Sequence, residues 1–263
     1  MNMKRSILLL LLSLSLWIAT PTSSANQVVT TLEVKPTVLV PGTGGDVDRF
    51  DEFIADIAQK EQIEVVKMTV HTDDTITMTG TISNQAKRPI IVVGFEDASD
   101  PALPEQSRWL ALALRKAQYL FHFTHFDYIG HSNGGLVATG YLENQQAGDP
   151  QMDHLVTLGT PFNDVGFDYN DTGVTFTDLK EESPLYSLYD EEQEAISADL
   201  AMLNVAGTSE GDSDAVVPVT SVAAGRIFYG NCEEYQEMTA DANHSDLVTD
   251  PQVEAAIADF LEW

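Results

Sequence analysis

Short apolar runs alternate along the chain with longer segments whose apolar residues recur at helical spacing. Buried strands are predicted at residues 37–40, 89–95, 126–129, 154–158 and 202–206, with a strand pair at 64–70 and 75–82. Helices are predicted at residues 48–62, 104–121, 135–144 and 191–201. A last strand is predicted at residues 226–229, and a closing amphipathic helix at residues 251–263. This alternation predicts the α/β class, with a mostly parallel, doubly wound sheet covered by helices on both faces.

The N-terminal residues have the pattern of a secretory signal peptide. Lys4 and Arg5 precede an apolar run at residues 7–18, and small residues follow it. The run is shorter than the roughly 20 residues that a membrane-spanning helix needs. We predict a signal peptide at residues 1–25, export to the cell surface or the medium, and no stable membrane anchor after cleavage. An uncleaved anchor is the alternative.

The remaining residues, 26–263, show no linker composition and are predicted to form a single domain. Within it, residues 165–190 lack a clear period and are rich in Asp, Asn, Gly and Thr. Such a segment between predicted strands is typical of a cap or insertion.

Acidic side chains outnumber basic ones by 41 to 13, and the formal net charge is −28. A charge of this size repels nucleic acids and anionic bilayers at long range, so neither is an expected partner. The single cysteine, Cys232, excludes an intramolecular disulfide. Stability must therefore come from a hydrophobic core, for which 263 residues with 43% hydrophobic content are sufficient.

The sharpest chemical signal is Gly130-His131-Ser132-Asn133-Gly134, a G-x-S-x-G sequence. It stands between a predicted strand and a predicted helix, where a serine can occupy a strained turn that lifts its hydroxyl clear of the backbone. Small residues two before and two after the serine allow that turn to close. The sequence therefore predicts Ser132 as a nucleophile.

A serine nucleophile needs a histidine base and a carboxylate that orients the base. In this strand–turn–helix context, the order along the chain is serine, acid, histidine. His154 comes too early, before its strand, whereas His244 lies just before the closing helix. His244 is therefore the predicted base.

Two aspartates compete for the role of the acid, because both follow the predicted strand at residues 202–206. Asp214 directly precedes the apolar residues 215–218, which would bury it against the histidine. Asp212 would more naturally be a solvated loop residue. Asp214 is the predicted acid, and Asp212 is the alternative.

An oxyanion hole needs two backbone N–H groups. One is predicted to be that of Asn133, the residue after the nucleophile. The other is predicted to be that of Thr43, in the glycine-rich turn after the first strand, with Gly44 as the second candidate. The turn lacks the spacing of a phosphate-binding loop.

This set of residues requires no cofactor and no metal. Residues 168–173 begin like a calcium-binding loop, with Gly173 in the sixth position. Leu179 stands where such a loop needs a bidentate glutamate. A solvated turn is the favoured interpretation, and loose calcium binding by this acidic segment is the alternative.

Several segments reach beyond the serine motif: VLVPGTGG, IGHSNGGL, LGTPFND, DAVVP and NHSDLVTDPQV. Together they resemble the bacterial cell-surface α/β hydrolases, a family of unknown function, and the resemblance extends from residue 35 to the C-terminus. It implies an α/β-hydrolase fold with Ser132 as nucleophile, Asp214 as acid and His244 as base.

One departure from that family concerns the glycine-rich turn that carries Thr43, called the oxyanion turn below. Relatives often carry His-Gly there, and this chain has Pro41-Gly42. The family does not fix a substrate. The hypothesis from the sequence is a secreted serine hydrolase, esterase- or lipase-like, that acts on a small-molecule or lipid ester. The alternatives are an acyltransferase or an amidase with the same residues, or an exported binding module without turnover.

Overall fold

A computed structural model of the chain describes residues 30–170, 179, 181–189 and 196–263. The predicted signal peptide at residues 1–25 lies outside the described residues, as does much of the predicted cap segment. The predicted calcium-loop positions between residues 171 and 178 lie outside them as well.

The described strands form one eight-stranded sheet in the order β3-β2-β4-β1-β5-β6-β7-β8. Its strands are β1 (Thr37–Val40), β2 (Ile63–Val70), β3 (Ile76–Gly80), β4 (Arg88–Phe95), β5 (His125–His131), β6 (Gln151–Leu158), β7 (Ala201–Gly207) and β8 (Glu234–Ala240). Only the β2–β3 pair within it is antiparallel. The predicted fold class, a mostly parallel sheet in an α/β chain, is confirmed.

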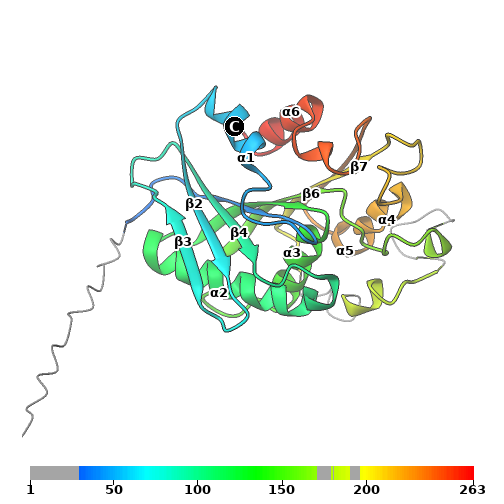
Figure 1. Cartoon of the computed structure of the whole chain (residues 1–263), viewed down its shortest axis with the longest axis horizontal. Coiled ribbons are helices and arrows are strands. Elements are labelled where there is room, and N and C mark those ends of the chain that lie inside the picture. Colours follow the sequence, from blue (N-terminus) through cyan, green and yellow to red (C-terminus); the bar gives the residue numbers. More distant parts are fainter. Residues whose placement is uncertain (1–29, 171–178, 180, 190–195) are drawn as a thin grey trace, which may run out of the picture.

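Helices cover both faces of this sheet (Figure 1). They are α1 (Asp51–Ala58), α2 (Leu103–Phe121), α3 (Asn133–Glu143), α4 (Val219–Ala223), α5 (Gly225–Tyr229) and α6 (Pro251–Phe260). One core cluster joins the sheet to α2, α3 and α5, and a second joins its other face to α1 and α6. Among the described helices, none is long and apolar enough to cross a lipid bilayer.

Strand β1 shows why the central strands consist mostly of consecutive apolar residues. All of its residues are buried, because both faces of the sheet are covered. Val38 and Val40 belong to the α2/α3 side of the core, and Leu39 to the α1/α6 side. Successive side chains of a strand point to opposite faces, so a doubly covered strand has apolar residues at successive positions, as at residues 38–40.

Most predicted elements overlap an element of the structure, but the strand predicted at residues 226–229 is wrong. These residues belong to the helix α5, and its Phe228 and Tyr229 rings pack 5.8 and 6.0 Å from the ring of Phe162. Aromatic residues favour strands only on average, and here the packing of the two rings decides the local structure.

The last strand of the sheet is β8, which the hydrophobic pattern did not predict. It is an edge strand, and most of its sequence, EYQEMTA, is polar and at least partly exposed. An exposed edge needs few apolar side chains, so the alternation that marks a buried strand is missing. The predicted helix at 191–201 is also wrong for residues 196–200, which form bends and turns before β7. Its first residues, 191–195, lie outside the described part.

Candidate active site

The candidate site lies at the carboxyl ends of the central strands. Strand β1 stands between β4 and β5, and the chain adds strands outward from it in both directions. In doubly wound sheets, loops that leave in opposite directions at such a point open a crevice where ligands bind. The turn after β1 and the turn after β5 meet here, and they carry Thr43 and Ser132.

Ser132 has a backbone conformation that non-glycine residues rarely adopt, with φ 55° and ψ −130°. Its N–H donates to the carbonyl of Leu158 at 2.8 Å. Its carbonyl accepts from the N–H of Gly135 at 3.0 Å and from the hydroxyl of Thr160 at 2.9 Å. Strain of this kind persists only where the surroundings hold the residue in place, and it is common at active sites.

The glycines of the serine motif are required by close backbone contacts. A Cβ on Gly130 would lie 2.6 Å from the nitrogen of Gly135. A Cβ on Gly134 would lie 2.2 Å from the carbonyl oxygen of Val40. Any side chain at these positions would therefore push α3 away from β5 and β1, and Ser132 would leave the strained turn.

The predicted acid and base form a hydrogen-bonded pair. The Nδ1 atom of His244 lies 2.7 Å from Oδ2 of Asp214, whose side chain has no solvent exposure. Oδ1 of Asp214 accepts the N–H groups of Val216 and Val217 at 3.0 and 2.6 Å. A carboxylate only accepts, so Nδ1 carries the proton and Nε2 keeps a free lone pair, as a general base requires. Asp212 is exposed.

The end of β6 brings the predicted acid and base to the serine. Leu158, the last residue of this strand, accepts the N–H of Ser132. A Cβ on the next residue, Gly159, would lie 2.9 Å from Oδ2 of Asp214 and 3.0 Å from Nδ1 of His244. Ser132 therefore bonds to Leu158, and the acid–base pair lies against Gly159, the next residue of the chain.

His131 lies against the predicted base. Its ring centroid is 4.7 Å from that of His244, and its Nε2–H donates to the carbonyl of His244 at 2.8 Å. Burial, followed by the positive charges of His244 and Arg49, lowers the pKa of His131 to about 3. The ring beside the base therefore stays neutral through the range in which proteins normally work.

The turn after β1 adjoins the serine closely, because a Cβ on Gly42 would lie 2.4 Å from Cβ of Ser132. Within this turn, the N–H of Gly44 donates to the carbonyl of Ala98 at 2.9 Å. That bond favours Thr43 over Gly44 as an oxyanion donor, since the amide of Thr43 has no acceptor in the described part of the protein.

The second predicted oxyanion donor, Asn133, is the first residue of α3, where backbone N–H groups lack intrahelical partners. Its side chain points to the oxyanion turn. Nδ2 of Asn133 donates to the hydroxyl of Thr43 at 2.6 Å and to Oδ1 of Asp100 at 2.8 Å. The residues predicted as oxyanion donors are thus joined through their side chains.

Sequence reasoning gave no role to two residues that touch this site. Thr160 holds the carbonyl of Ser132, and its only signal is its place in the segment LGTPFND. Asp100 contacts both Asn133 and the hydroxyl of Thr43. It stands in an acidic stretch of an acidic chain, so no pattern in the sequence distinguishes it.

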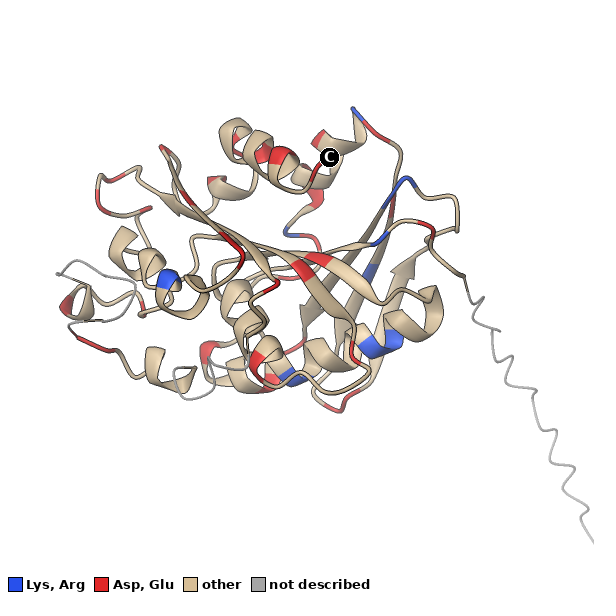
Figure 2. Ribbon diagram, turned by 180° about the vertical axis from the view of Figure 1, so that it is seen from behind, with Lys and Arg blue, Asp and Glu red and all other residues tan. Residues whose placement is uncertain are grey.

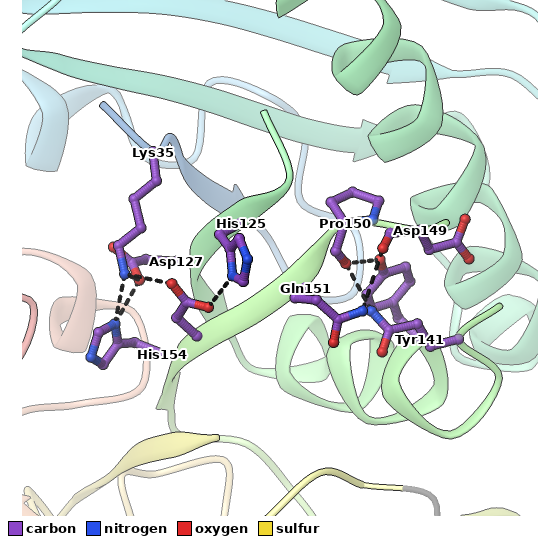
Figure 3. Close-up of polar contacts among 10 residues, drawn as sticks. Lys35, His125, Asp127, Tyr141, Asp149, Pro150, Gln151 and His154 are labelled. Atoms are coloured by element: carbon purple, nitrogen blue, oxygen red, sulfur yellow. Dashed lines mark hydrogen bonds and ion pairs between the residues drawn. The ribbon is translucent and has the colours of Figure 1, made fainter. Parts of the chain in front are cut away.

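Two histidines that precede the predicted acid in the chain, His125 and His154, lie away from Ser132 and close to Lys35 (Figure 3). His125 is the first residue of β5, and His154 lies in the amino-terminal half of β6. Nδ1 of His154 is 2.6 Å from Oδ1 of Asp127, and Nδ1 of His125 is 2.7 Å from Oδ1 of Asp153. Neither histidine can reach Ser132. In the described residues, no group of three or more His, Cys, Asp or Glu is placed to hold a metal ion.

The chain matches one protein-family model over most of its length. A family model described as "Alpha/beta hydrolase of unknown function (DUF915)" matches residues 24–263. The chain belongs to this family. The family suggested by the sequence segments is thereby confirmed, together with the α/β-hydrolase fold.

Two solved structures are similar to this α/β hydrolase over most of both chains. A gene product of Listeria innocua is 32% identical with a TM-score of 0.80, and the match covers 87% of this chain and 94% of that one. A protein of Lactobacillus plantarum named "putative cell surface hydrolase" is 28% identical with a TM-score of 0.72, covering 87% and 90%.

More distant structures share only the fold of this α/β hydrolase. One is an esterase from Pyrococcus furiosus, 13% identical with a TM-score of 0.52, which covers 87% of this chain and 81% of that one. Among curated proteins, none matches the chain.

Proposed function

We propose that this α/β hydrolase is an exported serine hydrolase that cleaves carboxylic esters. One observation carries the proposal. Ser132 stands in a strained turn at the carboxyl edge of the sheet, and the hydrogen-bonded Asp214–His244 pair is held at the same end of β6. A hydroxyl, an imidazole with a free Nε2 and a buried carboxylate are the groups that acyl transfer to serine needs.

In the first half of the proposed reaction, the hydroxyl oxygen of Ser132 attacks the ester carbonyl carbon while Nε2 of His244 takes the hydroxyl proton. Asp214 stabilises the imidazolium that forms and keeps it oriented. The amides of Thr43 and Asn133 donate to the oxyanion, each lowering the barrier by roughly 3 kcal/mol. His244 then gives its proton to the departing alkoxide, which leaves as an alcohol, and the acyl group remains on Ser132.

In the second half, water replaces the alcohol. His244 takes a proton from the water as it attacks the acyl carbon, and returns that proton to the Ser132 oxygen as the acid departs. The chain's own residues thus complete the cycle. The proposed substrate is a small-molecule or lipid ester.

Two observations support export. Residues 1–25 have the signal-peptide pattern described above. The similar protein of Lactobacillus plantarum is named a cell surface hydrolase. We propose on this basis that the enzyme acts at the cell surface or outside the cell.

Hydrolysis of p-nitrophenyl esters of graded acyl length tests the proposal. We expect turnover by the wild type and a loss of at least 1,000-fold in kcat for Ser132→Ala, because the nucleophile acts as a unit with its base. Ser83→Ala is the matched control, because Ser83 is exposed and contacts Glu64 near the amino-terminal end of β2. Undiminished activity in Ser132→Ala would contradict the proposal.

The same assay separates the alternatives for the reaction. Faster turnover of a matched anilide than of the ester would indicate an amidase. A new ester formed when an alcohol competes with water would indicate acyl transfer. A folded wild type that turns over none of the esters would indicate a binding module.

A further inference from the structure

We propose that Asp100 is a positioning residue that sets the spacing of the two oxyanion donors. The inference rests on the proposed function. Asp100 begins the short 3₁₀ helix η1 (Asp100–Ala102), which leads into α2. Its Oδ1 atom accepts from the hydroxyl of Thr43 and from Nδ2 of Asn133. One carboxylate oxygen therefore holds both residues whose backbone amides would bind the oxyanion.

The side chains of Asp100, Thr43 and Asn133 contact one another. Nδ2 of Asn133 also donates to the hydroxyl oxygen of Thr43 at 2.6 Å, so each of the three side chains contacts the other two. Thr43 is on the turn after β1 and Asn133 begins α3, and in the described part of the protein the side chain of Asp100 accepts from both.

Asp100 stands on a supported segment, as a positioning residue must. The buried Gln106 of α2 donates from Nε2 to the carbonyls of Asp97 and Ser99, at 3.1 and 2.9 Å. In the same segment, the carbonyl of Ala98 accepts the N–H of Gly44 at 2.9 Å. The oxyanion turn is therefore fixed to this segment through its backbone as well as through the Asp100 carboxylate.

Asp100 acts by holding the two amides in place, and its negative charge does not contribute to catalysis. An anion near a developing oxyanion raises the energy of the transition state, so the charge itself does not help the reaction. The benefit comes from holding the two amides before the substrate arrives, since oxyanion donors act through preorganisation. A loosened turn after β1 would leave substrate binding intact and weaken binding of the transition state.

Asp100→Ala tests the inference in steady-state kinetics with the best p-nitrophenyl ester. We expect kcat to fall about 10- to 100-fold, less than the loss of a whole oxyanion donor, with KM within twofold of the wild type. Asp100→Asn keeps an oxygen acceptor without the charge, so it should restore most of the lost rate. Glu105→Ala, which removes a carboxylate from the same end of α2, is the charge-matched control.

A trifluoromethyl ketone inhibitor gives a second readout, because its adduct with the serine carries an oxyanion. Its inhibition constant should rise in Asp100→Ala by the factor by which kcat/KM falls. Thr43→Val combined with Asp100→Ala should cost no more than the worse single variant, because both break one network. Thermal unfolding of each variant separates these effects from loss of the fold.

The outcomes distinguish the two proposals. If the wild type turns over esters and Asp100→Ala keeps its kcat, the positioning role is wrong and the proposed function stands. A loss that appears in KM alone, or that Asp100→Asn does not restore, also overturns the positioning role. If the wild type fails to hydrolyse any ester, both proposals fall together.

Discussion

At the scale of single residues, the acid–base pair shows how local bonds select one aspartate over another. Asp214 and Asp212 are two positions apart, and the sequence favours Asp214 only through its apolar neighbours. In the structure, Asp214 is fully buried and accepts from two backbone amides and from His244, whereas Asp212 is exposed. Burial and three donors fix both the place and the acceptor role of the Asp214 carboxylate.

Replacing each aspartate by asparagine compares them directly. The amide of Asp214→Asn can donate to Nδ1 of His244, which moves the imidazole proton to Nε2 and removes the base. We expect a loss of about 10⁴-fold in kcat, measured by ester hydrolysis. Asp212→Asn should stay within twofold of the wild type. A larger loss from Asp212→Asn than from Asp214→Asn would reverse the assignment of the acid.

His131 makes the stability of the protein sensitive to acid. Its folded-state pKa is lowered to about 3 from a reference of 6.5, so between these pH values the unfolded chain binds a proton that the folded protein does not. The free energy of unfolding therefore falls as pH drops below 6.5, by up to about 1.4 kcal/mol per pH unit from this residue. Above pH 6.5 this residue causes no such loss.

Urea unfolding at pH 7 and pH 4.5 measures this effect. His131→Gln keeps a donor for the carbonyl of His244 but cannot titrate, so it should lose less stability between the two pH values than the wild type does. His122→Asn, at an exposed position where asparagine tolerates the left-handed backbone, should lose as much as the wild type. Equal losses in all three proteins would contradict the role of His131.

At the scale of elements, the buried parts of the fold were predictable and the edge was not. The packing of β1 and of the strand–turn–helix around Ser132 requires apolar runs and glycines. These elements can therefore be recognised in the sequence. Strand β8 faces solvent and has no such pattern, and α5 follows from aromatic packing between distant residues. Propensity alone cannot report contacts of that kind.

The same division applies to the candidate site. A motif and the order of residues along the chain were enough to predict Ser132, Asp214 and His244 as candidates. The choice between Thr43 and Gly44 could not be made in this way, because it depends on a bond between Gly44 and a carbonyl more than fifty residues away. The chain pattern predicts which elements meet, and only their packing determines which polar atoms pair.

Gly159 links the end of β6 to the acid–base pair, so its substitution should affect activity more than stability. In Gly159→Ala, the added carbon would crowd Oδ2 of Asp214 and Nδ1 of His244, and we expect kcat to fall at least tenfold. Gly211→Ala is the matched control, because Gly211 also has positive φ but nothing within 4 Å of an added Cβ. Both variants should lose about 1 kcal/mol of stability from the backbone alone. Equal kcat values in the two variants would contradict the account.

At the scale of the whole molecule, the dominant feature is the excess of acidic side chains. Figure 2 shows them on strands, helices and loops, with few basic residues among them. Some basic residues pair, as Lys67 does with Asp48 and Asp51, but 41 acidic against 13 basic side chains leave a net charge of −28. The compact state therefore carries self-repulsion that the unfolded chain relieves.

Added salt should for this reason stabilise the protein. Screening weakens the repulsion, and it also weakens surface ion pairs, but each such pair contributes only about 0–1 kcal/mol. We expect the thermal unfolding midpoint to rise by several degrees between about 20 mM and 500 mM NaCl. The same rise in choline chloride would exclude a specific effect of sodium. A midpoint that falls with salt would show that attraction between charges outweighs repulsion.

The central claim is that residues distant in sequence make the hydroxyl of Ser132 reactive, and covalent labelling by a fluorophosphonate tests it most directly. Intact mass and peptide mapping should find a single adduct, on Ser132, which is lost in Ser132→Ala and forms far more slowly in His244→Ala. An adduct on another residue, or a folded wild type that does not react, would contradict the account.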